Sequence, residues 1–171
     1  MHRYVDYRRE DVGFVAPSPS ESTSVVVFIR PEPDFWHLAS ILDEEKLVTT
    51  LNGRTHFVYS TAPGPHRFMV HVTSLGPSYV DADLEGGKLY FVAVNPGSGS
   101  DPKGLIPVAP TGEYWPELRA WLDDSWLVEP SATALEWFRV DGSDLLNEQR
   151  TREPGAQVRQ LKQDQGVEHA P

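Results

Sequence analysis

Two runs of alternating polar and apolar residues, 54–60 and 66–72, stand on either side of a short segment that contains Pro63, Gly64 and Pro65. Successive side chains of a strand point to opposite faces, so this alternation is typical of half-buried strands. A connection rich in Pro and Gly between two such runs predicts an antiparallel hairpin. We expect its buried face to be formed by Phe57, Tyr59, Phe68, Val70 and Val72.

Further short runs rich in β-branched and aromatic residues continue this pattern. Turn signals such as Asn52-Gly53 and Gly86-Gly87 separate them, because glycine adopts a positive φ at little cost. These runs are expected to be strands, at residues 24–30, 39–43, 46–50, 78–84 and 88–94. Short strands at this spacing indicate a mainly β chain that forms a small antiparallel β-sandwich.

The composition divides the chain into three regions. Residues 1–22 form an N-terminal arm that ends in a polar linker of Ser and Pro, and residues 23–110 carry the predicted sandwich. Residues 111–171 are expected to be a short α-helical C-terminal extension. Linkers of this composition contribute little to a core, so we expect the arm to dock late or to stay mobile.

Apolar periodicity in the C-terminal region changes to that of a helix. Trp115, Leu118, Trp121 and Leu122 recur at spacings of three and four residues, which predicts an amphipathic helix over 113–124. Further helices are expected at residues 132–139, 141–152 and 156–164. The last of these is so polar that it needs a partner, in this chain or another, to be stable.

Charge and cysteine content narrow the classes of function. The formal net charge is -10, which disfavours binding to nucleic acid or to an anionic membrane. The chain has no Cys and therefore no disulfide, thiolate metal site or cysteine nucleophile. No run approaches the roughly 20 apolar residues of a membrane helix, and the N-terminus lacks the apolar stretch of a secretory signal. We expect a cytoplasmic location without membrane insertion, or the cell envelope if a leader has been removed.

The segment Pro63-Gly64-Pro65-His66, the alternating run that follows it and the later run 84–94 resemble two groups of domains. One is an uncharacterised family of small bacterial lipoprotein-type β-sandwiches. The other is the PEGA domain, in which Pro-Gly-x-His precedes alternating apolar residues. The resemblance covers about residues 23–96 and implies a transthyretin-like or carboxypeptidase-regulatory-like sandwich. It also implies a non-enzymatic module at cell envelopes or on larger surface assemblies, although this chain lacks the lipidated Cys.

Histidines are the first candidates for chemistry. The alternation could place His56 and His71 on one face, but two ligands do not make a structural zinc site. His66 is expected to hydrogen-bond to the Pro-Gly turn instead.

Acidic residues are the second candidates. Asp81, Asp83 and Glu85 share one strand face and could offer oxygens to calcium, but the glycine and final glutamate of a calcium loop are missing. A solvated strand edge is the favoured interpretation.

The chain also lacks a Gly-x-Ser-x-Gly elbow and a phosphate-binding loop. We therefore expect no catalytic residue, no cofactor and no bound metal.

Aromatic residues offer the remaining lead. Trp115, Trp121 and Trp137 are expected to fasten helices onto the sandwich, and Trp36, in a loop bounded by proline, is expected to be exposed. Both terminal segments hold few apolar residues, so a partner is expected to order them. The candidate interaction residues are Tyr4, Tyr7, Phe14, Phe35, Trp36, Leu145, Leu146, Val158 and Leu161.

Two classes of function follow. The first is a non-enzymatic structural or adaptor subunit that binds a protein partner, or copies of itself, through its terminal segments. The alternative is a carbohydrate- or peptide-binding sandwich that uses exposed aromatic rings. The first predicts termini that are ordered only in an assembly, and the second predicts a concave aromatic patch on a complete monomer.

Overall fold

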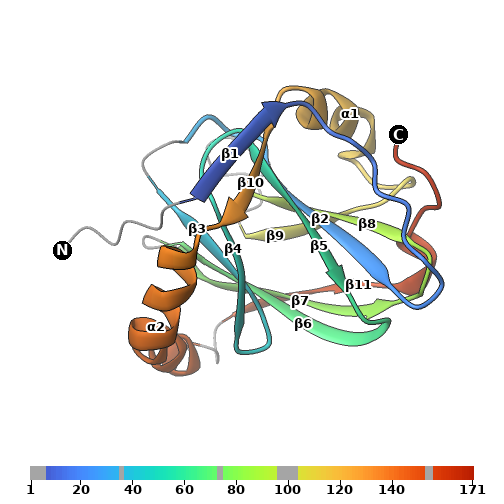
Figure 1. Ribbon diagram of the computed structural model, residues 1–171. Helices are drawn as coiled ribbons and strands as arrows, with labels where there is room; N and C mark the ends of the chain where they lie inside the picture. The colour runs from blue at the N-terminus through green and yellow to red at the C-terminus, as the bar shows by residue number, and fades with distance from the viewer. Residues whose placement is uncertain (1–6, 35–36, 73–74, 96–103, 153–155) are drawn as a thin grey trace.

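Two β-sheets face each other and enclose the main core, and a helix covers part of the outer face of each sheet (Figure 1). The computed structural model describes residues 7–34, 37–72, 75–95, 104–152 and 156–171. The prediction of a mainly β chain is confirmed, and the two facing sheets are consistent with a β-sandwich. None of the helices in these ranges combines the length and apolar character needed to cross a membrane.

The strands belong to two sheets of six and five strands. In spatial order, the first sheet contains β1 (Tyr7–Val12), β10 (Trp126–Pro130), β5 (Thr55–Thr61), β2 (Ser24–Arg30), β8 (Leu89–Val94) and β9 (Leu105–Val108). The second contains β11 (Gln157–Leu161), β7 (Leu75–Leu84), β6 (Gly64–Val72), β3 (Ala39–Asp43) and β4 (Lys46–Leu51). The helices are α1 (Trp115–Asp123), α2 (Ala132–Arg152) and the short 3₁₀ helix η2 (Gln163–Gln165).

Both sheets are mixed, so the expectation of a purely antiparallel sandwich is wrong. β2 runs parallel to β8, β10 to β5, and β11 to β7, whereas the other neighbours are antiparallel. Strands β1, β10 and β11 lie in the arm and in the extension predicted from the sequence, so the sandwich is not confined to residues 23–110. Parallel pairing joins segments far apart in the chain and leaves no local turn signal.

The predicted hairpin of residues 54–60 and 66–72 is wrong in its pairing. β5 pairs with β2 and β10 in the first sheet, whereas β6 pairs with β3 and β7 in the second. The chain therefore crosses from one sheet to the other between Thr61 and Gly64. The alternation of polar and apolar residues determines which side chains point into the core. It is the same for two strands paired in one sheet and for two strands in facing sheets, so it does not identify the partner of a strand.

The predicted inward faces of these strands are confirmed. Phe57 and Tyr59 pack against the main core, and Phe68, Val70 and Val72 belong to it. The centre of the Phe68 ring lies 5.2 Å from that of Phe28 and 6.3 Å from that of Tyr59, and both pairs are arranged edge to face. These contacts join the two sheets, since Phe28 and Tyr59 come from one and Phe68 from the other.

Each sheet also buries part of its outer face. On the first sheet, Val25, Val27, Ile29 and Phe91 pack under Leu118 and Leu122 of α1, with Phe14, Val167 and Ala170 at the margins. On the second sheet, Leu42, Met69 and Tyr79 pack under Phe138 and Leu146 of α2 and under Ala156. The predicted helix over 113–124 is confirmed as α1, and its Trp115 and Trp121 are partly buried on the sheet, as predicted.

The remaining C-terminal predictions need correction. The helices predicted at 132–139 and 141–152 are one continuous helix, α2, in which Val140 is helical like its neighbours. The helix predicted at 156–164 is instead strand β11, followed by η2. Leu161 lies in the core at 1% exposure, while Val158 is 46% exposed. Arg159 reaches from β11 to the carbonyl oxygen of Leu105 in the other sheet at 3.2 Å, which ties the two edges together.

Replacing Leu161 with Ala should lower the free energy of unfolding by about 2–4 kcal/mol, because the change empties a core position between the sheets. The matched variant Val158→Ala should cost less than about 1 kcal/mol, since that side chain is half exposed. Urea unfolding of both variants provides the measurement. Equal losses would contradict the strand, because an amphipathic helix with Val158 and Leu161 on one face would bury both.

Candidate interaction surface

Helix α2 has apolar residues on two sides, and one of them is already used. Phe138 and Leu146 pack on Leu42, Met69 and Tyr79 of the second sheet. Gly142, at the midpoint between them, is buried, so these positions follow steps of four residues along one helix face. This inner face fixes α2 on the sheet.

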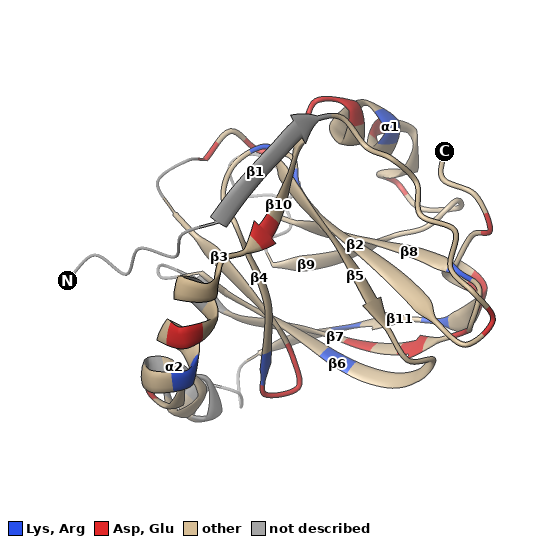
Figure 2. Ribbon diagram, viewed as in Figure 1, with Lys and Arg blue, Asp and Glu red and all other residues tan. Residues whose placement is uncertain are grey.

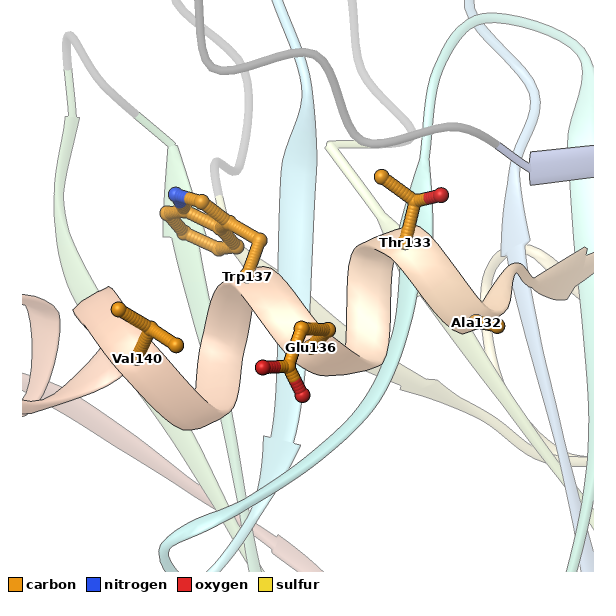
Figure 3. Close-up of a pocket in the computed structure, with 5 residues that line it drawn as sticks. All are labelled: Ala132, Thr133, Glu136, Trp137 and Val140. Atoms are coloured by element: carbon orange, nitrogen blue, oxygen red, sulfur yellow. The ribbon is translucent and has the colours of Figure 1, made fainter.

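The outer side of α2 carries an open hollow of about 530 Å³, lined by Ala132, Thr133, Glu136, Trp137 and Val140 (Figure 3). These residues recur at spacings of three and four, which places them on one side of the helix. Trp137 is half-buried, and Val140 is 59% exposed. We call this set the α2 outer face. Its area is mostly apolar, and the ring of Trp137 lies 6.5 Å from that of Phe138, measured between the ring centres.

Charged residues border the α2 outer face. Both carboxylate oxygens of Glu136 accept hydrogen bonds from Arg139, at 2.8 Å from Nε and 2.5 Å from Nη2. This fork lowers the pKa of Glu136 below its ordinary value. Glu129 precedes the helix on β10 and Asp144 lies one turn beyond Val140, and both are exposed. Figure 2 shows acidic and basic residues close to one another along α2.

The interaction candidates from the sequence fall in different places. Leu161 is buried in the main core, and Phe14 and Leu146 are partly buried against the outer clusters. Val158 is exposed on β11. Tyr7 and Leu145 lie in β1 and α2, with side chains outside the described part, and Tyr4, Phe35 and Trp36 are also outside it.

The α2 outer face was not among these candidates. Trp137 was predicted to fasten a helix onto the sandwich, but the residue that packs in the cluster on the second sheet is its neighbour Phe138. Adjacent residues on a helix point about 100° apart, so only one of two large rings in succession can lie at the centre of the face that packs on a sheet. The two consecutive rings, Trp137 and Phe138, were therefore the sequence signal that could have indicated a second apolar side of this helix.

His56 and His71, which were considered as partners in one site, are not brought together. His56 lies on β5 in the first sheet and His71 on β6 in the second. The Nδ1 atom of His56 is 2.7 Å from Ser125 Oγ, and that hydroxyl also donates to the carbonyl oxygen of Leu122 at 3.0 Å. Burial lowers the pKa of His56 to about 4. The pair holds β5 to the end of α1.

His66 bonds to the Pro-Gly turn as predicted. Its Nε2 donates to the carbonyl oxygen of Ala62 at 2.8 Å, and its Nδ1 lies 2.9 Å from Asp43 Oδ2. The same carboxylate accepts a hydrogen bond from Tyr59 at 2.9 Å. Burial, helped by Asp43, raises the pKa of Tyr59 to about 12. This cluster joins β3 and β6 to β5 of the opposite sheet.

Arg30 forms a third polar cluster at the end of β2. Its guanidinium donates to the carbonyl oxygens of Leu51 and His37 and forms an ion pair with Asp34 at 3.0 Å. The side chain is 2% exposed, and burial lowers its pKa although Asp34 opposes that change. Asp34 also lies 2.9 Å from His37 Nδ1. These contacts tie the chain after β2 to the end of β4.

Two of the three acidic residues considered for calcium, Asp81 and Asp83, have side-chain partners in the protein. Arg67 binds Asp81 through two hydrogen bonds, at 2.6 and 2.9 Å, and this lowers the pKa of Asp81. Asp83 accepts a hydrogen bond from Gln163 at 3.0 Å. Within the described ranges, no three His, Asp or Glu side chains are grouped in a way that could hold a metal ion.

Comparison with known proteins adds no identification, because neither a family model nor a curated protein matches the chain.

The buried His56 should make stability depend on pH. Its pKa is about 4 in the folded protein and about 6.5 when unfolded, so the unfolded chain binds a proton first as pH falls. The stabilisation is therefore complete above pH 6.5, and about 3 kcal/mol should be lost as pH falls towards 4.

Urea unfolding at several pH values compares the wild type with His56→Gln, which removes this titration. The free energy of unfolding of the variant should change less than that of the wild type between pH 6.5 and 4, whatever its absolute value. Val15→Ser, at an exposed position without a titratable group, serves as the control and should keep the wild-type slope. Parallel curves for the wild type and His56→Gln would refute the assignment.

Proposed function

We propose that the protein is a non-enzymatic adaptor or structural module that binds a protein partner through the α2 outer face. The observation that carries this proposal is the position of Trp137 and Val140, which form an apolar surface opposite the packed side of the same helix. Partly exposed tryptophans on rigid elements are frequent anchors of protein interfaces. An amphipathic groove or face of this kind is a common way of recognising a helix or peptide.

The packing of α2 supports a protein partner more than a small ligand. The lining residues in the described part of the chain all belong to α2, and an open surface on one helix suits contact with a protein. Trp115 and Trp121, which could have formed a sugar platform, are engaged with the first sheet. A carbohydrate- or peptide-binding module remains the alternative, and it would use Trp137.

The envelope role implied by the PEGA and lipoprotein resemblance, and the transthyretin-like topology, belong to this proposal as expectations. What supports them is the mainly β fold with two facing sheets. We also propose a cytoplasmic location, or a location at the cell envelope if a leader has been removed.

The test uses tagged full-length protein in a pull-down from native cells, with quantitative mass spectrometry. Truncation at the C-terminus is unsuitable because β11 belongs to the second sheet. Trp137→Ala should reduce capture of the partner at least about tenfold, since loss of such an anchor typically costs more than 1 kcal/mol. Its folding should be unchanged, as the inner face of α2 is intact.

Val15→Ser is the matched control, because it removes an apolar side chain that is 89% exposed elsewhere. It should leave capture unchanged. An identical set of captured proteins for the wild type and Trp137→Ala would contradict the proposal. Loss of binding to a glycan array in Trp137→Ala, with no protein captured by the wild type, would favour the alternative.

A further inference from the structure

Residues 166–171 lie across the first sheet beside α1, in the manner of a bound peptide (Figure 1). We call these residues the strap, and the edge of β8 on which they lie the slot. We propose that the slot is a second interaction site, for an extended peptide segment of a partner protein, and that the strap occupies it in the closed state. This site is distinct from the α2 outer face, which belongs to a helix on the other sheet.

The strap continues the line of β9 along one edge of β8. β9 pairs with β8 from Phe91 to Val94, and two residues before Phe91 the amide and carbonyl groups of Leu89 both bond to Val167 at 2.8 Å. This antiparallel bridge is isolated from the ladders of the sheet. Addition of an extended segment to a sheet edge is a common mode of peptide recognition, in which main-chain bonds give affinity and side-chain contacts give specificity.

The apolar side chains of the strap show what the slot accepts. Val167 and Ala170 are partly buried against the cluster under α1, which includes Leu89 and Phe91. These two strap positions are three residues apart. The slot therefore takes an aliphatic side chain at the paired position and a small apolar one further along.

Gly166 adds a steric requirement. A Cβ at this position would lie 2.7 Å from Cζ of Tyr90 and 2.9 Å from Cβ of Lys88. The ring of Tyr90 is fully buried, and its hydroxyl accepts a hydrogen bond from the amide of Glu85 at 2.9 Å, so it has little room to move. The residue before the paired aliphatic side chain must therefore be glycine.

The polar contacts of the strap complete the pattern. Glu168 lies 3.6 Å from Lys88 Nζ and is 73% exposed, so this ion pair is weak. Nη1 of Arg119 on α1 donates to the backbone oxygen of Pro171 at 3.0 Å, while its Nε bonds to Asp123. The slot thus selects the order glycine, aliphatic residue, acidic residue, any residue, small apolar residue, with the weakest selection at the acidic position.

The strap is held less firmly than the residues before it. Gln163 in η2 accepts a hydrogen bond from the Tyr90 hydroxyl at 3.2 Å and donates one to Asp83 at 3.0 Å. In the strap, Val167 and Ala170 are only partly buried. Segments with few buried contacts open locally at free energies below that of global unfolding. A partner's segment is favoured over the strap of a second copy, because two chains of net charge -10 repel each other.

Amide hydrogen exchange of the ¹⁵N-labelled full-length protein tests whether the strap opens. The Leu89 and Val167 amides, bonded across the bridge, should exchange at least about tenfold faster than the Val25 amide, which bonds to Lys88 on the other edge of β8. Val167→Asp should speed exchange at Leu89 at least about tenfold further, because it places a charge against apolar side chains. His169→Asp adds the same charge at an exposed strap position and should change that rate less than about threefold.

A peptide with the sequence of residues 164–171, added to the labelled protein, tests whether the slot binds in trans. It should bind Val167→Asp saturably, with shifts at the Leu89 amide, and bind the wild type at least about tenfold more weakly, because the strap competes at high effective concentration. The same peptide with Ala at the position of Gly166 should bind at least about tenfold more weakly. If Val167→Asp does not fold, Gly166→Ala, which also expels the strap, takes its place.

Several outcomes would overturn the inference. Leu89 and Val167 amides that exchange as slowly as Val25 in the wild type would show that the strap does not open, and this measurement needs no variant. Absence of peptide binding to the opened protein, or equal binding of the two peptides, would remove the slot as a site. A dimer in sedimentation that exchanges straps would make a second copy the occupant. Trp137→Ala should alter none of these measurements, so the proposed function and this inference fail or stand separately.

Discussion

The structure depends on the need to cover both faces of β2. All seven residues of this strand are buried. Val26 and Phe28 point into the core between the sheets, while Val25, Val27 and Ile29 point to the opposite side. A central strand that is apolar on both faces is stable only when another layer covers each face. The second sheet supplies one cover, and α1 with Phe14 and the C-terminal residues supplies the other, so both ends of the chain converge on this strand.

The sequence predicted elements better than it predicted their partners. β2 was predicted with its observed bounds, because a β-branched run stopped by Pro31 is a local signal. The pairing of β5 and β6 was not, since the inward faces are the same in a hairpin and in two facing sheets. The segment of β11 was predicted as part of a polar helix over 156–164, in which Val158 and Leu161 are among the few apolar residues. The segment is a strand because it pairs in parallel with β7, which lies far from it in the sequence.

The turn at Asn52-Gly53 shows the same limit on a smaller scale. The glycine was expected to supply a positive φ, but the positive value of 55° falls on Arg54. Gly53 is required for space instead, because a Cβ there would lie 2.6 Å from the amide nitrogen of Asp34 and 2.7 Å from the carbonyl oxygen of Glu32. That close approach depends on where the chain after Arg30 packs, which no local pattern encodes.

The way α2 is held bears on how it could bind. An isolated helix of this polarity is marginal in water, so α2 owes its stability to Phe138 and Leu146 on the second sheet. Under the proposed function, the outer face would be formed before the partner binds, and binding would not carry the entropy cost of folding the helix. This differs from terminal segments that become ordered only on a partner. Changes on the inner face would weaken binding by loosening α2, whereas changes on the outer face would act on the interface alone, so stability measurements distinguish the two.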